Sequence, residues 1–345
     1  MSEKKLKTIK KFDTVYCADS VEWCPHEDNQ YMFLCGTYQL EDSPKSSQFD
    51  TKCKRKGRIY IFNLKFKSKP LDLVYQLETN AILDQKWHPR EPLFATADSK
   101  GVVTLYKLSP NLLEEVSKVN LDPENGEILA LSLDWSPDGT KIIVSDSKGG
   151  INVIANTPNG LQLVQNHPSV HSFEAWTCIF DKNDPNVVYT GGDDTFLNCY
   201  DTRTDFSLKW RNKSHGAGVT SLLSFAENAL ISGSYDDNLR FFDTRQVKRA
   251  VFEKNLGGGI WRIKKNARNE LLTANMYHNF TVLEVNDDNF DITASYFKHK
   301  SICYGADWCP VEDKKGCQYI ATCSFYDHLL CVAKYGNKDD LTGDM

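Results

Sequence analysis

Acidic and basic side chains recur one or three residues before an anchor residue, most often Trp, in successive parts of the chain. The anchors are Trp23, Trp87, Trp135, Phe180, Leu223, Lys265 and Trp308. The charged residues before them are Glu22, Asp84, Lys86, Asp134, Arg262, Lys264 and Asp307. Such groups, gathered in a partly dehydrated cleft, shift one another's pKa values and become candidates for acid–base chemistry or ligand binding. The alternative, a polar and water-filled channel without chemistry, stays open.

Motifs of the common hydrolases and metal centres are absent from the sequence. It has no Gly-x-Ser-x-Gly elbow, no His-Glu-x-x-His, no Gly-x-x-x-x-Gly-Lys and no Cys-x-x-Cys. Cysteines and histidines crowd residues 299–331, but their spacing matches no usual zinc pattern, so we expect buried thiols and no metal. Any chemistry must come from residues that the fold brings together.

The anchors follow one another at intervals of 64, 48, 45, 43, 42 and 43 residues. Between them, apolar runs alternate with turns rich in Gly, Asp and Ser, as in "KIIVSDSKGGINVI" (141–154). A period of roughly 40 to 45 residues with several short strands is typical of WD-repeat propeller blades. We therefore predict an all-β, seven-bladed WD-repeat β-propeller that takes residues 1–345 as a single domain.

Strand-like segments stand at both ends of the chain, at 12–17 and 328–335. Pairing them in one blade would remove exposed sheet edges, so we predict that the N- and C-terminal strands close the ring. Three segments are expected to be flexible: the basic N-terminus 1–11, a polar insertion at 41–57 in the first blade, and the C-terminus 336–345. The insertion accounts for the long first interval.

Strand alternation predicts which side chains reach the axis. The strand that leads to each anchor is the innermost of its blade, so side chains one, three and five residues before the anchor share one face. Only four of these 21 are large aliphatic residues, whereas eleven of the 14 residues two and four before the anchors are apolar. We predict that the first set lines the channel and that the second packs inside the blades.

Two histidines have a structural explanation. In WD repeats a His, a strand Ser or Thr, a turn Asp and an aromatic residue form a buried hydrogen-bonded set, since buried polar groups persist only when they have partners. Two groups fit this pattern: His171 with Thr190 and Asp194, and His215 with Ser232 and Asp236.

The composition is that of a soluble globular protein, with 41% hydrophobic and 25% charged residues. The net charge of −5 argues against generic nucleic-acid binding, which needs a basic face. Eleven cysteines, with no apolar N-terminal segment and no run long enough to span a bilayer, predict a reducing compartment. We expect a cytoplasmic monomer that binds no nucleic acid and spans no membrane.

Ten segments stand out when the chain is read in order. They are "ADSVEWCP" (18–25), "CGTYQL" (35–40), "AILDQKW" (81–87), "ALSLDWSP" (130–137), "HSFEAW" (171–176), "VYTGGDD" (188–194), "SGSYDD" (232–237), "GGGIWRIK" (257–264), "YGADW" (304–308) and "ATCSFYDH" (321–328). Together they resemble the WD-repeat diphthine methyl ester hydrolases of diphthamide biosynthesis, a family named diphthine methyltransferases. The resemblance runs across essentially all the blades.

The resemblance implies an esterase that acts on a protein. Its expected substrate is methylated diphthine, carried by a modified histidine of translation elongation factor 2. Removal of the methyl group leaves the carboxylate that the final amidation to diphthamide requires. Water is the co-substrate, and no cofactor is implied. The resemblance supplies no catalytic residues, so these must be assigned from position.

Ester hydrolysis needs an activated water or nucleophile, a group that stabilises the oxyanion, and a substrate pocket. We hypothesise a composite site at the channel mouth. Its candidate catalytic residues are His171 or His328 as base, Glu174 or Asp327 to orient that base, and Arg262 or the backbone amides of 257–259 to face the oxyanion. Among the channel carboxylates, Asp84 and Asp307 are candidates for substrate binding.

Diphthine also carries a trimethylammonium group, which aromatic faces bind by cation–π attraction of about 2 kcal/mol when desolvated. Trp176, Trp261 and Tyr304 lie near the starts of their strands and would supply such faces. Alternation assigns the same three residues to the blade interior. Plain core packing is therefore the alternative to an aromatic cage.

Two other functions stay open. One is a non-catalytic scaffold, the commonest role of WD propellers. The other is a substrate receptor of a cullin-type ubiquitin ligase, because "YDTR" (200–203) and "FFDTR" (241–245) resemble the Asp-x-Arg ends used for adaptor docking. Arg203 and Arg245 are otherwise explained as surface residues at strand exits.

Overall fold

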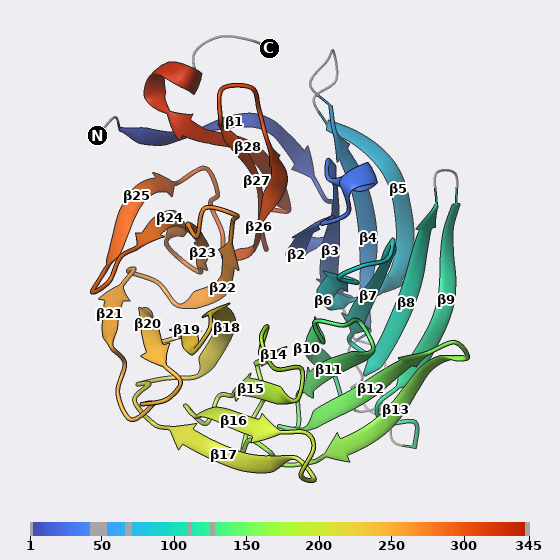
Figure 1. The fold of residues 1–345 in the computed structure, drawn as a ribbon. Helices are drawn as coiled ribbons and strands as arrows, with labels where there is room; N and C mark the ends of the chain where they lie inside the picture. Colours follow the sequence, from blue (N-terminus) through green and yellow to red (C-terminus); the bar gives the residue numbers. More distant parts are fainter. Residues whose placement is uncertain (1–2, 42–53, 66–70, 110–111, 125–127, 342–345) are drawn as a thin grey trace.

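The computed structural model describes residues 3–41, 54–65, 71–109, 112–124 and 128–341. These residues form seven four-stranded antiparallel sheets arranged in a ring around one axis (Figure 1). The prediction of an all-β, seven-bladed propeller is confirmed. The spacing of the anchors was enough to predict the number of blades, because each sequence repeat forms one sheet.

The first four blades follow the chain without interruption. Blade 1 contains β2 (Cys17–Trp23), β3 (Met32–Leu40), β4 (Arg55–Leu64) and β5 (Leu71–Asn80), with the short 3-10 helix η1 (Glu27–Asn29). Blade 2 contains β6 (Ile82–Trp87), β7 (Leu93–Asp98), β8 (Val102–Ser109) and β9 (Leu112–Asn120). Blade 3 contains β10 (Ala130–Trp135), β11 (Lys141–Asp146), β12 (Ile151–Thr157) and β13 (Gly160–His167). Blade 4 contains β14 (Thr177–Phe180), β15 (Val187–Gly191), β16 (Leu197–Asp201) and β17 (Ser207–Asn212).

The remaining three blades include the one that closes the ring. Blade 5 contains β18 (Val219–Ala226), β19 (Ala229–Ser234), β20 (Asn238–Asp243) and β21 (Phe252–Asn255). Blade 6 contains β22 (Ile260–Lys265), β23 (Leu271–Asn275), β24 (Asn279–Val285) and β25 (Phe290–Tyr296). Blade 7 contains β26 (Cys303–Glu312), β27 (Gln318–Ser324), β28 (Leu329–Asn337) and β1 (Lys4–Asp13).

Each blade presents its loops on two opposite faces of the ring. The chain enters a blade at its innermost strand and meanders outward, so strand order follows the sequence in every sheet except that of blade 7, where β1 is the outermost strand. Neighbouring strands are antiparallel, so the loops that enter each blade lie on the same face as the turns between its second and third strands. We call this the upper face. The other turns lie on the lower face.

Pairing of β1 with β28 closes the ring, in a register that runs from Lys4 opposite Asn337 to Asp13 opposite Leu329. The predicted closure is confirmed. The expected flexibility of the N-terminus is not found in residues 4–11, which form this strand because pairing to β28 and packing of Leu6 and Ile9 hold them.

The other two segments that we expected to be flexible are only partly described. Residues 336–337 extend β28, and the 3-10 helix η2 (Lys338–Leu341) follows with Leu341 buried. The end of the insertion, from Arg55, belongs to β4. Residues 1–2, 42–53 and 342–345 lie outside the described residues.

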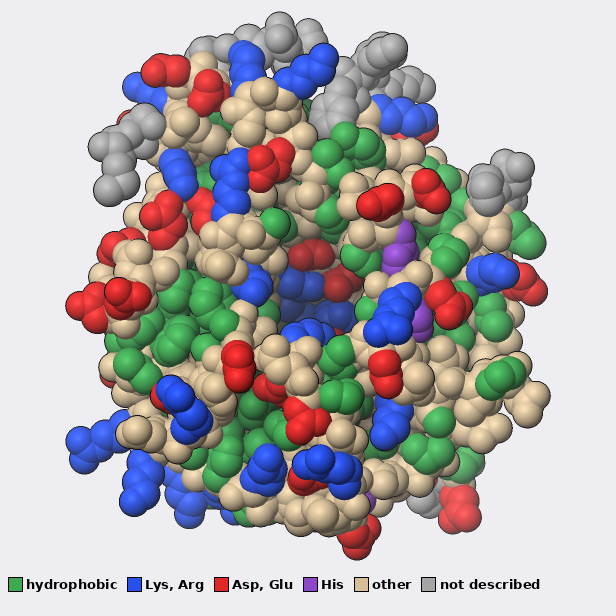
Figure 2. Space-filling view, in the orientation of Figure 1, with side chains coloured by type: hydrophobic (Ala, Val, Ile, Leu, Met, Phe, Trp, Pro, Cys, Tyr) green, Lys and Arg blue, Asp and Glu red, His purple; other side chains and the backbone are tan. Residues whose placement is uncertain are grey.

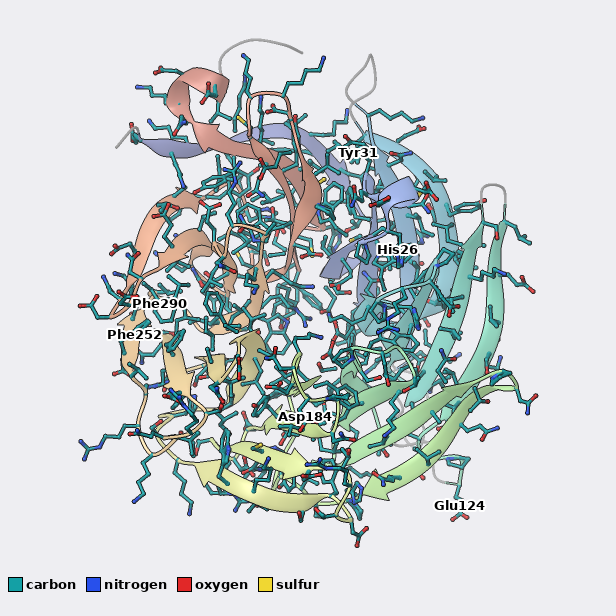
Figure 3. The ribbon with its side chains drawn as sticks, in the orientation of Figure 1. His26, Tyr31, Glu124, Asp184, Phe252 and Phe290 are labelled. Carbon is teal, nitrogen blue, oxygen red and sulfur yellow. The ribbon has the colours of Figure 1, made fainter. Side chains whose placement is uncertain are left out.

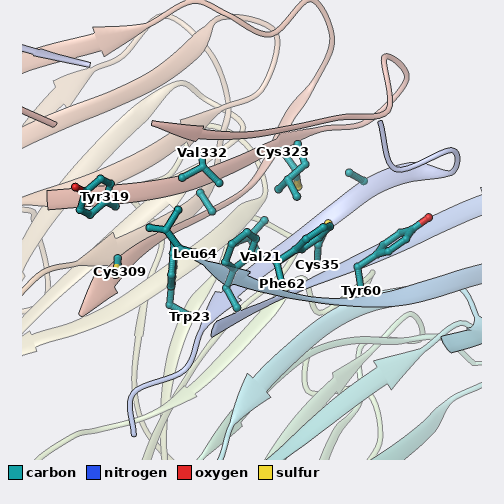
Figure 4. Packing of buried hydrophobic residues seen from close by; sticks show 14 residues of the cluster. Val21, Trp23, Cys35, Tyr60, Phe62, Leu64, Cys309, Tyr319, Cys323 and Val332 are labelled. Carbon is teal, nitrogen blue, oxygen red and sulfur yellow. The ribbon is translucent and has the colours of Figure 1, made fainter. Parts of the chain in front are cut away.

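Apolar side chains fill the spaces between neighbouring blades. Figure 4 shows the cluster in which Trp23 and Phe62 of blade 1 pack with Val332 of blade 7. Phe252 of blade 5 and Phe290 of blade 6 make the same kind of contact near the rim of the ring, with ring centroids 4.8 Å apart (Figure 3). These contacts between blades hold the inner strands in fixed positions around the axis.

A β-bulge interrupts the alternation of most inner strands. The pairing of β2 with β3 skips one residue between Ala18 and Ser20, and β6, β10 and β22 skip one at the equivalent place. An extra residue reverses the face taken by the side chains upstream of it. Residues five before the anchors, predicted to line the channel, are therefore buried in apolar clusters instead: Ala18, Ile82, Ala130 and Ile260. Residues two before the anchors are mostly buried in apolar clusters, as Val21, Leu133 and Ile263 show.

Ring closure gives a prediction for Phe12, whose ring contacts Phe62 edge-on with centroids 4.9 Å apart. Replacing the half-buried Phe12 with Ala should lower the free energy of unfolding by about 2 kcal/mol, because it removes apolar contacts between β1 and blade 1. Urea denaturation measures the change. Lys10→Ala, in the same strand but exposed, should shift it by less than about 0.5 kcal/mol. Equal effects of the two substitutions would contradict this role of Phe12.

Candidate functional site at the channel mouth

A network of ion pairs joins four inner strands at the axis. The ammonium groups of Lys86 and Lys264 both contact the carboxylate of Glu22, and Lys264 Nζ lies 3.7 Å from Asp307 Oδ1. Figure 2 shows side chains of both charges gathered in the hollow at the centre of the ring. The charged residues one before the anchors of blades 1, 2, 6 and 7 thus meet at the axis and neutralise one another there. At the same position in blades 4 and 5, Ile179 and Leu222 pack in an apolar cluster instead.

Arg262 and Asp84 extend this network across the axis. Arg262 Nη1 lies 3.4 Å from Asp84 Oδ1, although the two residues come from blades 6 and 2, which are not neighbours. Burial opposes ionisation of Asp84, but Arg262 and Lys86 hold its pKa at about 2. The structure brings together these two predicted site residues. Arg262 remains a cation held in the upper part of the channel.

Channel aspartates also bind the backbone of other blades. Asp84 Oδ2 accepts hydrogen bonds from Ser132 Oγ and Leu133 N at 3.2 and 3.1 Å. Asp307 Oδ2 accepts one from Trp23 N at 2.7 Å, which joins blade 7 to blade 1. The carboxylates of Asp84 and Asp307 are therefore engaged within the protein, which favours positioning of inner strands over direct contact with a substrate.

Four aromatic rings meet above the ion network, and we call them the aromatic rim: Trp176, Tyr235, Trp261 and Tyr304. The indole of Trp261 stacks on Tyr304 with centroids 4.9 Å apart and lies 5.7 Å from Trp176. Tyr235 lies 6.0 Å from both tryptophans. Blades 4 and 6 are not neighbours, so Trp176 and Trp261 can meet only in front of blade 5. All four side chains are half-buried.

Strand alternation alone assigned Trp261 and Tyr304 to the blade interior, and the structure shows why this was wrong. Trp261 is the bulged residue of β22, and Tyr304 lies in the irregular start of β26. The bulge turns the position four before the anchor out of the blade interior. The rings that the sequence offered either as a cage or as core packing therefore gather at the upper mouth of the channel and remain partly exposed.

Two carboxylates flank the rim. Trp176 Nε1 donates a hydrogen bond of 2.9 Å to Asp193 Oδ1, and Asp193 N donates one of 2.9 Å to Glu174 O. Glu174, predicted to orient a catalytic His, is half-buried here and acts electrostatically on Tyr235. The structure places it beside the aromatic rim. Negative charge next to exposed ring faces favours the binding of a cation.

Three residues at the channel mouth were missed by the sequence analysis: Tyr235, Asp193 and Asp19. Asp19 is the most deeply buried of the three. It is the bulged residue of β2, four before Trp23, in the position that Trp261 has in β22. Only 6% of it is exposed. Burial raises the pKa of Asp19 to about 8, while Arg262 opposes this shift and Asp84 adds to it. The shared position with Trp176, Trp261 and Tyr304 was the signal that could have identified Asp19.

His171 lies away from the rim in a closed hydrogen-bond set. Its Nδ1 is 2.8 Å from Asp194 Oδ1 and its Nε2 is 2.8 Å from Thr190 Oγ1, and the residue is buried. Both ring nitrogens are therefore occupied. This geometry corresponds to the structural alternative for His171 and leaves no ring nitrogen to act as a base on a substrate.

Asp327 has the same structural role in blade 7, together with His299. Asp327 accepts hydrogen bonds from Lys300 N and Ser324 Oγ, and Ser324 also bonds to His299. The adjacent His328 lies apart from the aromatic rim, in an open depression on the upper face. That depression is lined by Val15, Tyr16, Gln39, Leu40, Glu41, Lys56 and His328. The predicted pairing of Asp327 with His328 does not form.

His215 departs in part from its predicted set. Its Nε2 is 2.8 Å from Ser232 Oγ, as expected, but Asp236 pairs with Arg240 at 2.8 Å instead. Burial and the charge of Arg240 lower the pKa of His215 to about 4. The neutral imidazole is a structural element of blade 5.

The remaining sequence candidates lie outside the channel mouth or are engaged locally. Gly257 N donates to Asn255 Oδ1 at 3.0 Å, so the 257–259 turn offers fewer free amides than expected. Arg203 and Arg245 are exposed, and each pairs with the Asp two residues before it. This agrees with their explanation as strand-exit residues.

Neither a metal centre nor a membrane helix is found in the part of the chain that the structure describes. No three His, Cys, Asp or Glu residues there are placed to hold a metal ion, and the ten cysteines within the described ranges are buried free thiols. Among these same residues, no helix has the length and apolar character needed to cross a membrane.

Comparisons with known proteins agree with this geometry. Residues 207–243 match the family model described as WD domain, G-beta repeat. A chain from the crystal structure of the mitotic checkpoint complex superposes with a TM-score of 0.72 at 13% identity, covering 95% of this chain and 91% of that one. The ring of seven sheets therefore defines a WD-repeat propeller.

Three relatives are informative over most of their length. The diphthine methyltransferase of Schizosaccharomyces pombe is 34% identical over 87% of this chain and 90% of its own, and that of Homo sapiens is 34% identical over 87% and 74%. The Dictyostelium discoideum homolog is 32% identical over 95% and 98%. The chain belongs to the diphthine methyltransferase family, as its motifs predicted.

The raised pKa of Asp19 predicts how stability depends on pH. Between about pH 4 and pH 8 the folded protein keeps a proton that the unfolded chain releases, so this group makes stability fall as the pH rises. Asp19→Asn removes that loss. The variant should match the wild type near pH 4 and exceed it by on the order of 2 kcal/mol near pH 8. Thermal unfolding across this range tests the effect, and parallel curves would contradict it.

Proposed function

We propose that this protein is a carboxyl methyl ester hydrolase that converts methylated diphthine on translation elongation factor 2 to diphthine, before the final amidation to diphthamide. The single observation that carries the proposal is the aromatic rim above a buried cation. Membership in the diphthine methyltransferase family supplies the substrate class. We place the site at the upper mouth of the channel and the protein in the cytoplasm.

The substrate presents a trimethylammonium group on the carbon that bears the methyl ester. A site for it needs aromatic faces for the cation and, one carbon away, a positive group for the ester oxygen. Trp261, Tyr304 and Trp176 offer the faces, and the carboxylates of Glu174 and Asp193 add negative charge beside them. This pattern supports recognition of a quaternary ammonium group.

Arg262 is the group that we assign to the ester carbonyl. It precedes Ile263 on the same inner strand as Trp261 and stays charged, because Asp84 and Asp19 outweigh the effect of burial on its pKa. A preorganised cation at the position where an oxyanion develops can contribute roughly 3 kcal/mol to catalysis. The guanidinium would also bind the product carboxylate.

A protein substrate requires a surface around the site as well as a pocket. Several large apolar side chains are exposed in the loops and turns of the upper face: Phe173, Tyr277, Phe297 and Tyr326. Their exposure, from 60% to 81%, is unusual for such side chains and supports contact with a protein. We propose that the elongation factor covers this face while its modified histidine reaches the rim.

The direct test is incubation of the purified protein with elongation factor 2 that carries methylated diphthine, followed by intact mass measurement of the factor. We expect a loss equal to one methylene group. An unchanged mass, with an active esterase control on the same substrate, would favour a scaffold. A gain of one methylene group in the presence of a methyl donor would contradict hydrolysis.

The cation site predicts the behaviour of Trp261→Leu. Loss of a cation–π contact of about 2 kcal/mol should raise KM about 30-fold, with a smaller effect on kcat. Steady-state kinetics on the modified factor measures both. Trp210→Leu, a half-buried Trp on the outer strand β17, is the matched control and should leave KM unchanged. Tetramethylammonium should inhibit the wild type competitively; failure to inhibit would remove the cation site from the proposal.

A further inference from the structure

We propose that Asp19 is the general base of the hydrolysis, acting on the water that attacks the ester carbonyl. This inference rests on the proposed function and assigns its missing catalytic group. It comes from the position of Asp19, which is close enough to Tyr304 of the aromatic rim and to Arg262 to interact electrostatically with both, and from the contrast with the other carboxylates around the axis.

The first argument is position. The bulge in β2 turns Asp19 out of the blade at the same level as Trp261 in β22, one of the four residues of the aromatic rim. The inner strand β26 of blade 7 lies between β2 and β22 in the ring. A Cβ at Gly305 would be 2.8 Å from Ser20 C, so this glycine allows β26 and β2 to approach closely. Tyr304, next to Gly305, interacts electrostatically with Asp19.

The second argument is that the other channel carboxylates are engaged. Glu22 contacts two lysines, and Asp84 and Asp307 combine ion pairs with backbone hydrogen bonds. Within the described ranges, the side chain of Asp19 makes no direct hydrogen bond or ion pair. An aspartate residue that is 94% buried without such partners is costly to a fold, and chemistry explains its presence better than stability does.

The proton balance of the step is complete with water alone. Asp19 takes a proton from water while the water oxygen bonds to the ester carbon, and the negative charge moves to the carbonyl oxygen facing Arg262. The carbon–methoxy bond then breaks, and Asp19 returns the proton to the leaving oxygen, which departs as methanol. The new carboxylic acid ionises to solvent and pairs with Arg262.

The surroundings of Asp19 suit this role. A base works best when its pKa lies near the working pH, and burial raises that of Asp19 to about 8. Asp19 interacts electrostatically with five titratable or charged groups, each on a different strand. They are Cys17, Asp84, Arg262, Tyr304 and Cys323. Arg262 favours the ionised form, and Asp84 disfavours it.

The test compares Asp19→Asn and Asp19→Glu with the wild type on the modified elongation factor. We expect Asp19→Asn to lower kcat at least 100-fold with KM changed less than about threefold, because only proton transfer is lost. Asp19→Glu keeps a carboxylate and should be at least 10-fold faster than Asp19→Asn. The rise of wild-type kcat with pH toward about pH 8 should be absent in Asp19→Asn.

Asp134→Asn is the matched control, since Asp134 lies on the inner strand of blade 3 and accepts a hydrogen bond from Phe180 N. It should keep kcat within about threefold. Thermal unfolding and quenching of Trp fluorescence by tetramethylammonium verify that each variant is folded with its rim intact. An inactive wild type would refute the proposed function. An active wild type with an equally active Asp19→Asn, or with equally inactive Asn and Glu variants, would refute the assignment of Asp19.

Discussion

Closure of the ring is the constraint on which the other features depend. An open array of twisted sheets would leave β28 as an exposed edge, whereas β1 pairs with it along its length. Once the ring is closed, seven inner strands surround one axis. Side chains from different blades then lie close together there, so each buried charge among them needs a partner of opposite charge.

The channel beneath the aromatic rim satisfies this condition by pairing of charges. Desolvated charges destabilise a fold unless each has a partner, and breaking such a pair is costly. Glu22 with Lys86 and Lys264, and Asp84 with Arg262, meet across blades that are separated in sequence. These pairs, together with backbone contacts such as that of Asp307 to Trp23, fix the inner strands. The channel is thus a rigid support for its mouth.

The bulges separate this support from the site above it. Without them, alternation would direct the residue four before each anchor into a blade. With the extra residue, Trp261 and Asp19 turn outward at the same level and meet groups from other blades. The site that we propose, a cation-binding rim with an acid–base group, can be assembled in this way without any contiguous catalytic motif.

Much of this protein could be predicted from the sequence because the relevant signals are local and repeated. The spacing of the anchors fixed the number of blades, strand-like ends implied closure, and His171 had the neighbours of a structural histidine. The family followed from motifs in order. What the tertiary structure alone decided is which face of a strand each side chain takes beyond a bulge. A bulge is defined by the pairing of one strand with the next, so the sequence of a single strand does not reveal it. The positions of Asp19, Trp261 and Tyr304 are therefore known only from the folded ring.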